Sequence, residues 1–132
     1  MTNVLDEFAA TFDRCWLCGT KAGQTWPPKL EIHHIARGSH RGAAREERAA
    51  LIRTCQPCHR ERLDSMPIVQ QLAIKWKFDH DGYDLATVNR LRHRDANAIM
   101  ESEVRVAYYE MMALREESDA HCGILYPFNQ VR

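Results

Sequence analysis

Two closely spaced cysteine pairs constrain the fold of this 132-residue chain more than any other feature of its sequence. Cys15 and Cys18 form the first Cys-x2-Cys pair, and Cys55 and Cys58 form the second. A gap of two residues lets both sulfurs of a pair bind one ion, and four thiolates complete the closed tetrahedral shell of a structural zinc. The alternative is four ordinary small core residues, but two such spacings rarely coincide in one small unit. We therefore predict a four-cysteine zinc site that folds the intervening segment back on itself.

The cysteine count and the N-terminus indicate a reducing compartment. A secreted disulfide scaffold usually has an even number of cysteines and an export signal, whereas this chain has five cysteines and an acidic first segment. No apolar run approaches the ~18 residues of a transmembrane helix. These features predict a cytoplasmic protein with no membrane partner. The fifth cysteine, Cys122, stands alone near a helix end, and we interpret it as a partly buried residue without chemistry.

The pattern of apolar, glycine and proline residues predicts short strands in the first half of the chain and helices in the second. Strands are expected at residues 29–35 and 51–55. One or two helical turns are expected within residues 44–50. Longer helices are expected at residues 3–13, from residue 56 onward, at 68–77, after Asp84 as N-cap, and at 98–117.

The change of character near residue 66 predicts how the chain is organised. Residues 1–13 form an N-terminal helix, residues 14–66 a loop-rich core, and residues 67–132 a helical extension that either stands apart or packs on that core. A unit of ~65 residues buries little apolar surface and usually needs a staple. The predicted fold class is therefore small α+β: a hairpin and helix stapled by the four-cysteine zinc site, with helices added at both ends.

Three histidines accompany the cysteine pairs. His33 and His34 are adjacent at the end of the first expected strand, and His59 directly follows the second pair. The segments C-x2-C, LEIHHI and ALIRTCQPCH, in that order, resemble the HNH endonucleases, in the variant whose zinc knuckles flank the ββα-metal hairpin. The resemblance covers roughly residues 14–64. Similar arrangements with a helical C-terminal extension are common among phage-encoded proteins, so the resemblance also implies a phage or prophage origin and a host-cell cytoplasm.

The resemblance implies a role for each histidine. His34 would be the general base, because an imidazole with a pKa near 6.5 accepts a proton at neutral pH. His33 and His59 would bind a catalytic divalent metal, namely Mg²⁺, Mn²⁺, Ni²⁺ or Zn²⁺. The implied activity is hydrolysis of DNA phosphodiester bonds to 5′-phosphate and 3′-hydroxyl ends.

One position departs from the family pattern. The family has an asparagine five residues before the third knuckle cysteine, and this chain has Ala50 there. Alanine cannot orient the catalytic imidazole through a side-chain oxygen. A backbone carbonyl, Glu46 or Glu47 is the expected substitute.

The zero net charge of the chain is an average over two unlike segments. Residues 29–63 hold eight basic and four acidic side chains, whereas residues 67–132 hold eight and ten. A basic segment predicts double-stranded DNA as a partner, bound with salt-sensitive affinity. Arginine matches phosphate geometry, and we expect Arg37, nearest the histidines, to contact the reacting phosphate. The full set of arginines expected to bind DNA is Arg37, Arg41, Arg45 and Arg48. The alternative is a solvated loop in which these arginines pair with Glu46 and Glu47.

Three functions remain open from the sequence. The first is a metal-dependent HNH endonuclease. The second is a zinc-ribbon-like DNA-binding module without turnover, which Ala50 allows. The third is a phage protein-interaction adaptor that uses the C-terminal helices. The sequence predicts neither the DNA sequence recognised, nor nicking against double-strand cleavage, nor the oligomeric state.

Overall fold

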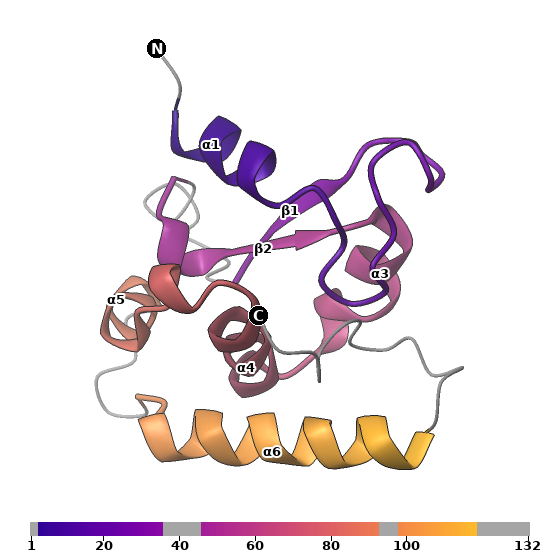
Figure 1. The fold of residues 1–132 in the computed structure, drawn as a ribbon. Helices are drawn as coiled ribbons and strands as arrows, with labels where there is room; N and C mark the ends of the chain where they lie inside the picture. Colours follow the sequence, from indigo (N-terminus) through magenta and orange to yellow (C-terminus); the bar gives the residue numbers. More distant parts are fainter. Residues whose placement is uncertain (1–2, 36–45, 93–97, 119–132) are drawn as a thin grey trace.

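The computed structural model describes residues 3–35, 46–92 and 98–118, and these residues form a small α+β fold (Figure 1). This fold confirms the predicted class: an N-terminal helix, an antiparallel hairpin followed by a helix, and further helices toward the C-terminus. The long elements are α1 (Val4–Thr11), β1 (Glu31–His34), β2 (Leu51–Thr54), α3 (Gln56–Glu61), α4 (Ile68–Phe78), α5 (Leu85–Leu91) and α6 (Glu101–Ser118). The short 3-10 turns are η2 (Arg48–Ala50), η3 (Leu63–Ser65) and η4 (His80–Gly82).

Local side chains explain where several helices begin. The Asn3 side chain caps α1 by accepting a hydrogen bond from the Asp6 N–H. Asp84, the predicted N-cap of α5, accepts one from the Thr87 N–H. The last helix begins at Glu101, later than expected. The Glu103 side chain accepts a hydrogen bond from the Met100 N–H at 2.7 Å and so caps the helix at its N-terminal end. Among the described residues, no helix has the length and apolar character needed to cross a membrane.

The two strands pair as an antiparallel hairpin. His33 lies opposite Ile52 and His34 lies opposite Leu51, and the pairing extends to a 2.8 Å bond from the Ile35 N–H to the Ala50 carbonyl. Both strands are shorter than the expected ranges. Because side chains alternate along a regular strand, Glu31 and His33 share one face of β1 and His34 lies on the other.

One apolar core connects the three segments of the chain. Phe8 of α1 packs on Trp16 with ring centroids 5.7 Å apart, and Trp16 stacks on Phe78 of α4 at 5.5 Å. Figure 1 shows α4 between the hairpin and α6, and α4 and α6 pack against each other. Val104 and Met111 of α6 belong to the same buried cluster as Leu51 and Ile52 of β2. The helical extension is thus packed on the hairpin rather than held apart from it.

A buried charged network fastens α4 to the hairpin. Lys75 of α4 is fully buried and donates hydrogen bonds to the Leu51 carbonyl at 3.0 Å and to Asp79 at 2.7 Å. Arg48 donates to the same carboxylate, with Nε 3.0 Å from Oδ2. Burial lowers the pKa of Lys75 to about 8, although Asp79 opposes this. Burial alone would raise the pKa of Asp79, but hydrogen bonds from Arg48 and Lys75 bring it below its ordinary value.

We expect Asp79→Ala to destabilise the protein by about 3–5 kcal/mol, because it leaves the buried ammonium group of Lys75 without its carboxylate. Thermal or urea unfolding followed by circular dichroism measures this loss. Asp81→Ala is the matched control, since Asp81 is exposed on η4, the 3-10 turn that Asp79 caps. Equal stability of the two variants would show that the network contributes nothing.

Candidate metal centres

The four knuckle cysteines form one cluster. Their sulfur atoms all lie within 4.8 Å of one another, and Cys18 Sγ lies 3.7 Å from Cys55 Sγ. The four cysteines are free thiols rather than disulfides. Four thiolates at ~2.3 Å around a tetrahedral ion have sulfur–sulfur distances of about 3.8 Å, so this spacing fits a zinc-like ion. The cluster therefore suggests a structural metal, with the ligand set that the sequence predicts.

The electrostatics of the cluster favour a bound cation. A hydrogen bond from the Cys58 thiol lowers the pKa of Cys15 to about 4, and the same contact raises the pKa of Cys58. Burial raises the pKa of Cys55 to about 11. Without a bound cation, one ionised thiolate thus opposes the ionisation of the neighbouring thiols. A divalent cation would offset this repulsion and favour all four thiolates.

The knuckles position the hairpin and the helix that follows it. Gly19 adopts φ 81°, which favours glycine, and its N–H closes the first knuckle by bonding to the Cys15 carbonyl at 2.9 Å. The Trp16 N–H donates to the Arg53 carbonyl at 3.0 Å, which holds this knuckle beside β2. Cys55 is the N-cap of α3, so the second knuckle directly determines where His59 lies.

A second group of ligand atoms lies between the hairpin and α3. His33, His59 and Asp64 each offer one ligand atom, and these atoms lie within 4.8 Å of one another, close enough to hold one metal ion. The rings of His33 and His59 are 5.0 Å apart, centroid to centroid, and His59 Nε2 lies 3.7 Å from Asp64 Oδ1. The His33 side is buried, whereas the Asp64 side chain is 47% exposed. A metal held here would be open to solvent on one side, as a site that exchanges water requires.

Glu31 orients the His59 ring. Glu31 Oε1 lies 2.8 Å from His59 Nδ1, and a carboxylate at neutral pH can only accept a hydrogen bond. We therefore assign the proton of neutral His59 to Nδ1, which leaves the lone pair on Nε2, the nitrogen nearer Asp64. A metal-binding histidine whose other nitrogen donates to a carboxylate is a common arrangement in metal sites. Glu31 thus supports His59 from the strand that also carries His33.

Asp64 is a candidate ligand that the sequence did not predict. A helix continuing from His59 would turn through about 500° over five residues, at 3.6 residues per turn, and would direct Asp64 away from His59. Instead α3 ends at Glu61, its C-cap Arg62 has non-helical φ and ψ of −120° and −57°, and η3 follows. This break returns Asp64 to the histidines. Only the five-residue spacing from His59 could have indicated Asp64, and helical periodicity argues against it.

The structure does not bring His34 into this group. His34 ends β1, is half-buried, and lies on the face of the strand opposite His33. Ala50, at the position of the family asparagine, is buried, and its carbonyl accepts the hydrogen bond from Ile35. The role of His34 as a general base therefore stays a prediction carried by the resemblance.

The arginines expected to bind DNA have different outcomes. Arg37, Arg41 and Arg45 lie outside the described residues, as does Cys122. Arg48 lies within them and is paired with Asp79, so its charge already has an intramolecular partner. Arg53, which contributes to the basic segment, donates to the carbonyls of Phe12 at 2.9 Å and Leu30 at 3.2 Å and joins loops to the hairpin. Part of the positive charge of residues 29–63 thus stabilises the fold.

Comparison with known proteins assigns neither a family nor a function to this chain. No family model, no curated protein and no solved structure matches this sequence or this fold.

Proposed function

We propose that this protein is a metal-dependent endonuclease of the HNH type that hydrolyses phosphodiester bonds of double-stranded DNA. The observation that carries the proposal is the convergence of His33, His59 and Asp64 beside a hairpin and helix held by four cysteines. The sequence resemblance predicts two of these three ligands and the order of the elements around them. The four-cysteine cluster, with zinc bound, would serve the fold alone, because four thiolates leave no position for substrate.

The ligand set suits hydrolysis rather than storage of a metal. Two imidazoles and one carboxylate leave coordination positions for a water and a phosphate oxygen. A bound divalent ion would supply Lewis-acid stabilisation of the charge that develops on the phosphate and on the leaving 3′ oxygen. His33, His59 and Asp64 would hold that ion, and the hydrogen bond from His59 to Glu31 would keep His59 in the tautomer that can bind it.

The remaining steps are assigned to His34 and to the arginines after it. His34 accepts a proton from water as the water oxygen bonds to phosphorus and the bond from phosphorus to the 3′ oxygen breaks. This role requires the scissile phosphate to lie at the end of the hairpin, where residue 34 ends β1, rather than over one face of the strand. Arg37 follows closely in the sequence, and we propose that it contacts the same phosphate.

Plasmid nicking tests the proposal. Wild-type protein, loaded with zinc and supplied with Mg²⁺, Mn²⁺ or Ni²⁺, should convert supercoiled plasmid to open circles with 5′-phosphate ends. His34→Ala should slow nicking by about 10²- to 10⁴-fold, because a positioned general base contributes that much. Binding of a linear duplex in a gel shift at low salt should stay unchanged, since phosphate contacts dominate it.

Two other outcomes identify the alternatives. Wild-type protein that shifts DNA but cuts nothing with any of these metals is a DNA-binding module, an interpretation that Ala50 and the position of His34 favour. Wild-type protein that neither binds nor cuts DNA at low salt is better explained as a protein-interaction adaptor. Either result overturns the nuclease assignment.

A further inference from the structure

We propose that Gln71, on the helical extension, is a positioning residue of the metal site and sets its affinity for the ion. The inference rests on the metal site of the proposed function, but not on DNA as the substrate. Gln71 lies on α4, is 2% exposed, and contacts both chain segments that bracket the site. Through its amide, α4 therefore contacts two of the three ligand positions: His33 itself and the turn that carries Asp64.

The hydrogen bonds of Gln71 determine which way its amide faces. The side-chain amide nitrogen, Nε2, lies 2.8 Å from the Met66 carbonyl oxygen and 3.3 Å from the Leu63 carbonyl oxygen. Carbonyl oxygens only accept hydrogen bonds, so the NH₂ group must face them. The amide oxygen Oε1 then faces His33 Nε2 at 2.6 Å. The reverse orientation would direct Oε1 against two carbonyl oxygens and lose both bonds.

This orientation selects one tautomer of His33. Because Gln71 Oε1 can only accept, His33 Nε2 must carry the proton and donate it. Neutral imidazole has one protonated nitrogen, so the lone pair that binds a metal is on Nδ1. His59 is held in the opposite tautomer by Glu31. Each histidine of the site thus has a partner that presents a defined nitrogen to the ion.

The same amide also holds the turn that carries the third ligand. Leu63 begins η3, which contains Asp64, and Met66 is its C-cap; Gln71 donates hydrogen bonds to both of their carbonyls. Loss of this amide would release the His33 ring and the Asp64 turn together. A buried glutamine that only filled space would not need to satisfy a ligand ring and two carbonyls of a ligand-bearing turn. Partners of this kind typically change metal affinity by about 10- to 100-fold when removed.

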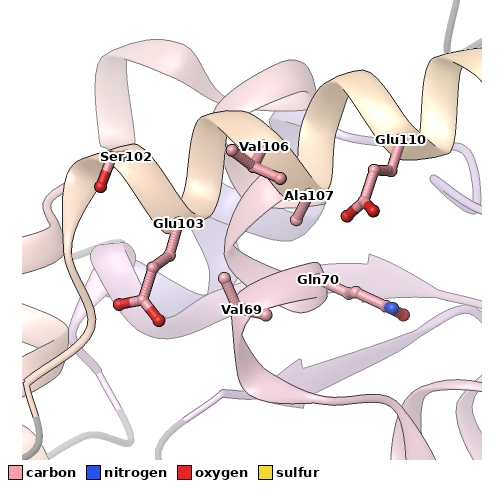
Figure 2. Close-up of a pocket in the computed structure, with 7 residues that line it drawn as sticks. All are labelled: Val69, Gln70, Ser102, Glu103, Val106, Ala107 and Glu110. Atoms are coloured by element: carbon pink, nitrogen blue, oxygen red, sulfur yellow. The ribbon is translucent and has the colours of Figure 1, made fainter.

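Titration calorimetry with Mn²⁺ on the zinc-loaded, full-length protein tests this role. Mn²⁺ is the probe because carboxylate and imidazole ligands accept it, whereas thiolates prefer zinc. Gln71→Met, which keeps the length of the side chain but removes the amide, should weaken Mn²⁺ binding about 10- to 100-fold. Gln70→Met is the matched control, since Gln70 lines the groove between α4 and α6 on the side of α4 shown in Figure 2. It should bind Mn²⁺ like wild type. Equal affinity of the two variants overturns the proposal.

A measurement on the wild-type protein keeps the inference testable if Gln71→Met does not fold. Long-range ¹H–¹⁵N spectra of metal-free site histidines at about pH 8 report which ring nitrogen carries the proton. We expect His33 to be protonated on Nε2 and His59 on Nδ1. A proton on Nδ1 of His33 overturns the proposal, because Gln71 would then not be selecting the tautomer.

These results separate the inference from the nuclease assignment. Mn²⁺ binding that depends on Gln71, without any DNA cleavage, supports the positioning role and removes the nuclease function. DNA cleavage and Mn²⁺ binding that are both insensitive to Gln71→Met support the nuclease function and overturn the positioning role of Gln71.

Discussion

Cys55→Ser should unfold the hairpin and α3 and release one equivalent of zinc per chain. Structural zinc sites contribute about 10–16 kcal/mol of binding free energy at neutral pH. A small domain has a net stability of about 5–15 kcal/mol, so the remaining interactions cannot replace the metal. Cys55 both contributes a sulfur to the cluster and forms the N-cap of α3, so its loss affects the staple and the helix together. Metal analysis and circular dichroism measure the two effects.

Cys122→Ser is the control for this experiment, because Cys122 belongs to neither knuckle. It should retain one zinc and the unfolding temperature of the wild type. Normal zinc content and normal stability in Cys55→Ser would contradict the four-thiolate assignment. Treatment of wild-type protein with a chelator should reproduce the loss of structure without any substitution.

His59→Ala should remove metal binding at the second site and strongly reduce plasmid nicking. His59 lies within reach of His33 and Asp64 and directly follows the last knuckle cysteine, so its loss would remove the ligand that α3 contributes to the candidate site. A metal ion supplies several kcal/mol of transition-state stabilisation, and each 1.36 kcal/mol is a factor of ten. We therefore expect nicking to fall by about 10³-fold or more, with Mn²⁺ binding lost in calorimetry.

His80→Ala is the matched control for His59→Ala. His80 is exposed on η4, where its ring packs near Trp76 with centroids 5.8 Å apart. It should leave Mn²⁺ affinity and nicking unchanged. Nicking that survives in His59→Ala at the wild-type rate would show that the His33, His59 and Asp64 group is not the catalytic site.

The zinc knuckles explain why much of the fold could be predicted. Cys15 and Cys18 must meet Cys55 and Cys58, so any strands between the pairs return on each other. Ligand spacing is a local property of the sequence, as are the Asp84 cap and the helical periodicity of residues 68–77. The approach of His33 to His59 follows from the same closure, because each lies close in sequence to an element that the knuckles hold.

The partners of the site histidines could not be predicted in this way. Gln71 lies beyond the boundary expected at residue 66, on a helix whose apolar periodicity indicates only that it packs. Glu31 is an ordinary polar strand residue in the sequence, and only the position of α3 brings His59 against it. Arg48 shows the converse, since a basic residue between two strands is typical of a phosphate contact, and only the fold pairs it with Asp79.

The sequence alone determined the four-cysteine cluster, the order of hairpin and helix, and two of the three residues of the candidate second metal site. These features depend on residues a few positions apart, or on cysteine pairs that a common ligand cluster draws together. The tertiary structure decided the position of Asp64 beside the two histidines, the hydrogen-bond partner of each histidine ring, and the packing of the helical extension against them. These features depend on a helix break at Arg62 and on contacts between segments about 30 to 40 residues apart. Such contacts form only when burial of the shared core brings those segments together, and no local pattern in the sequence encodes them.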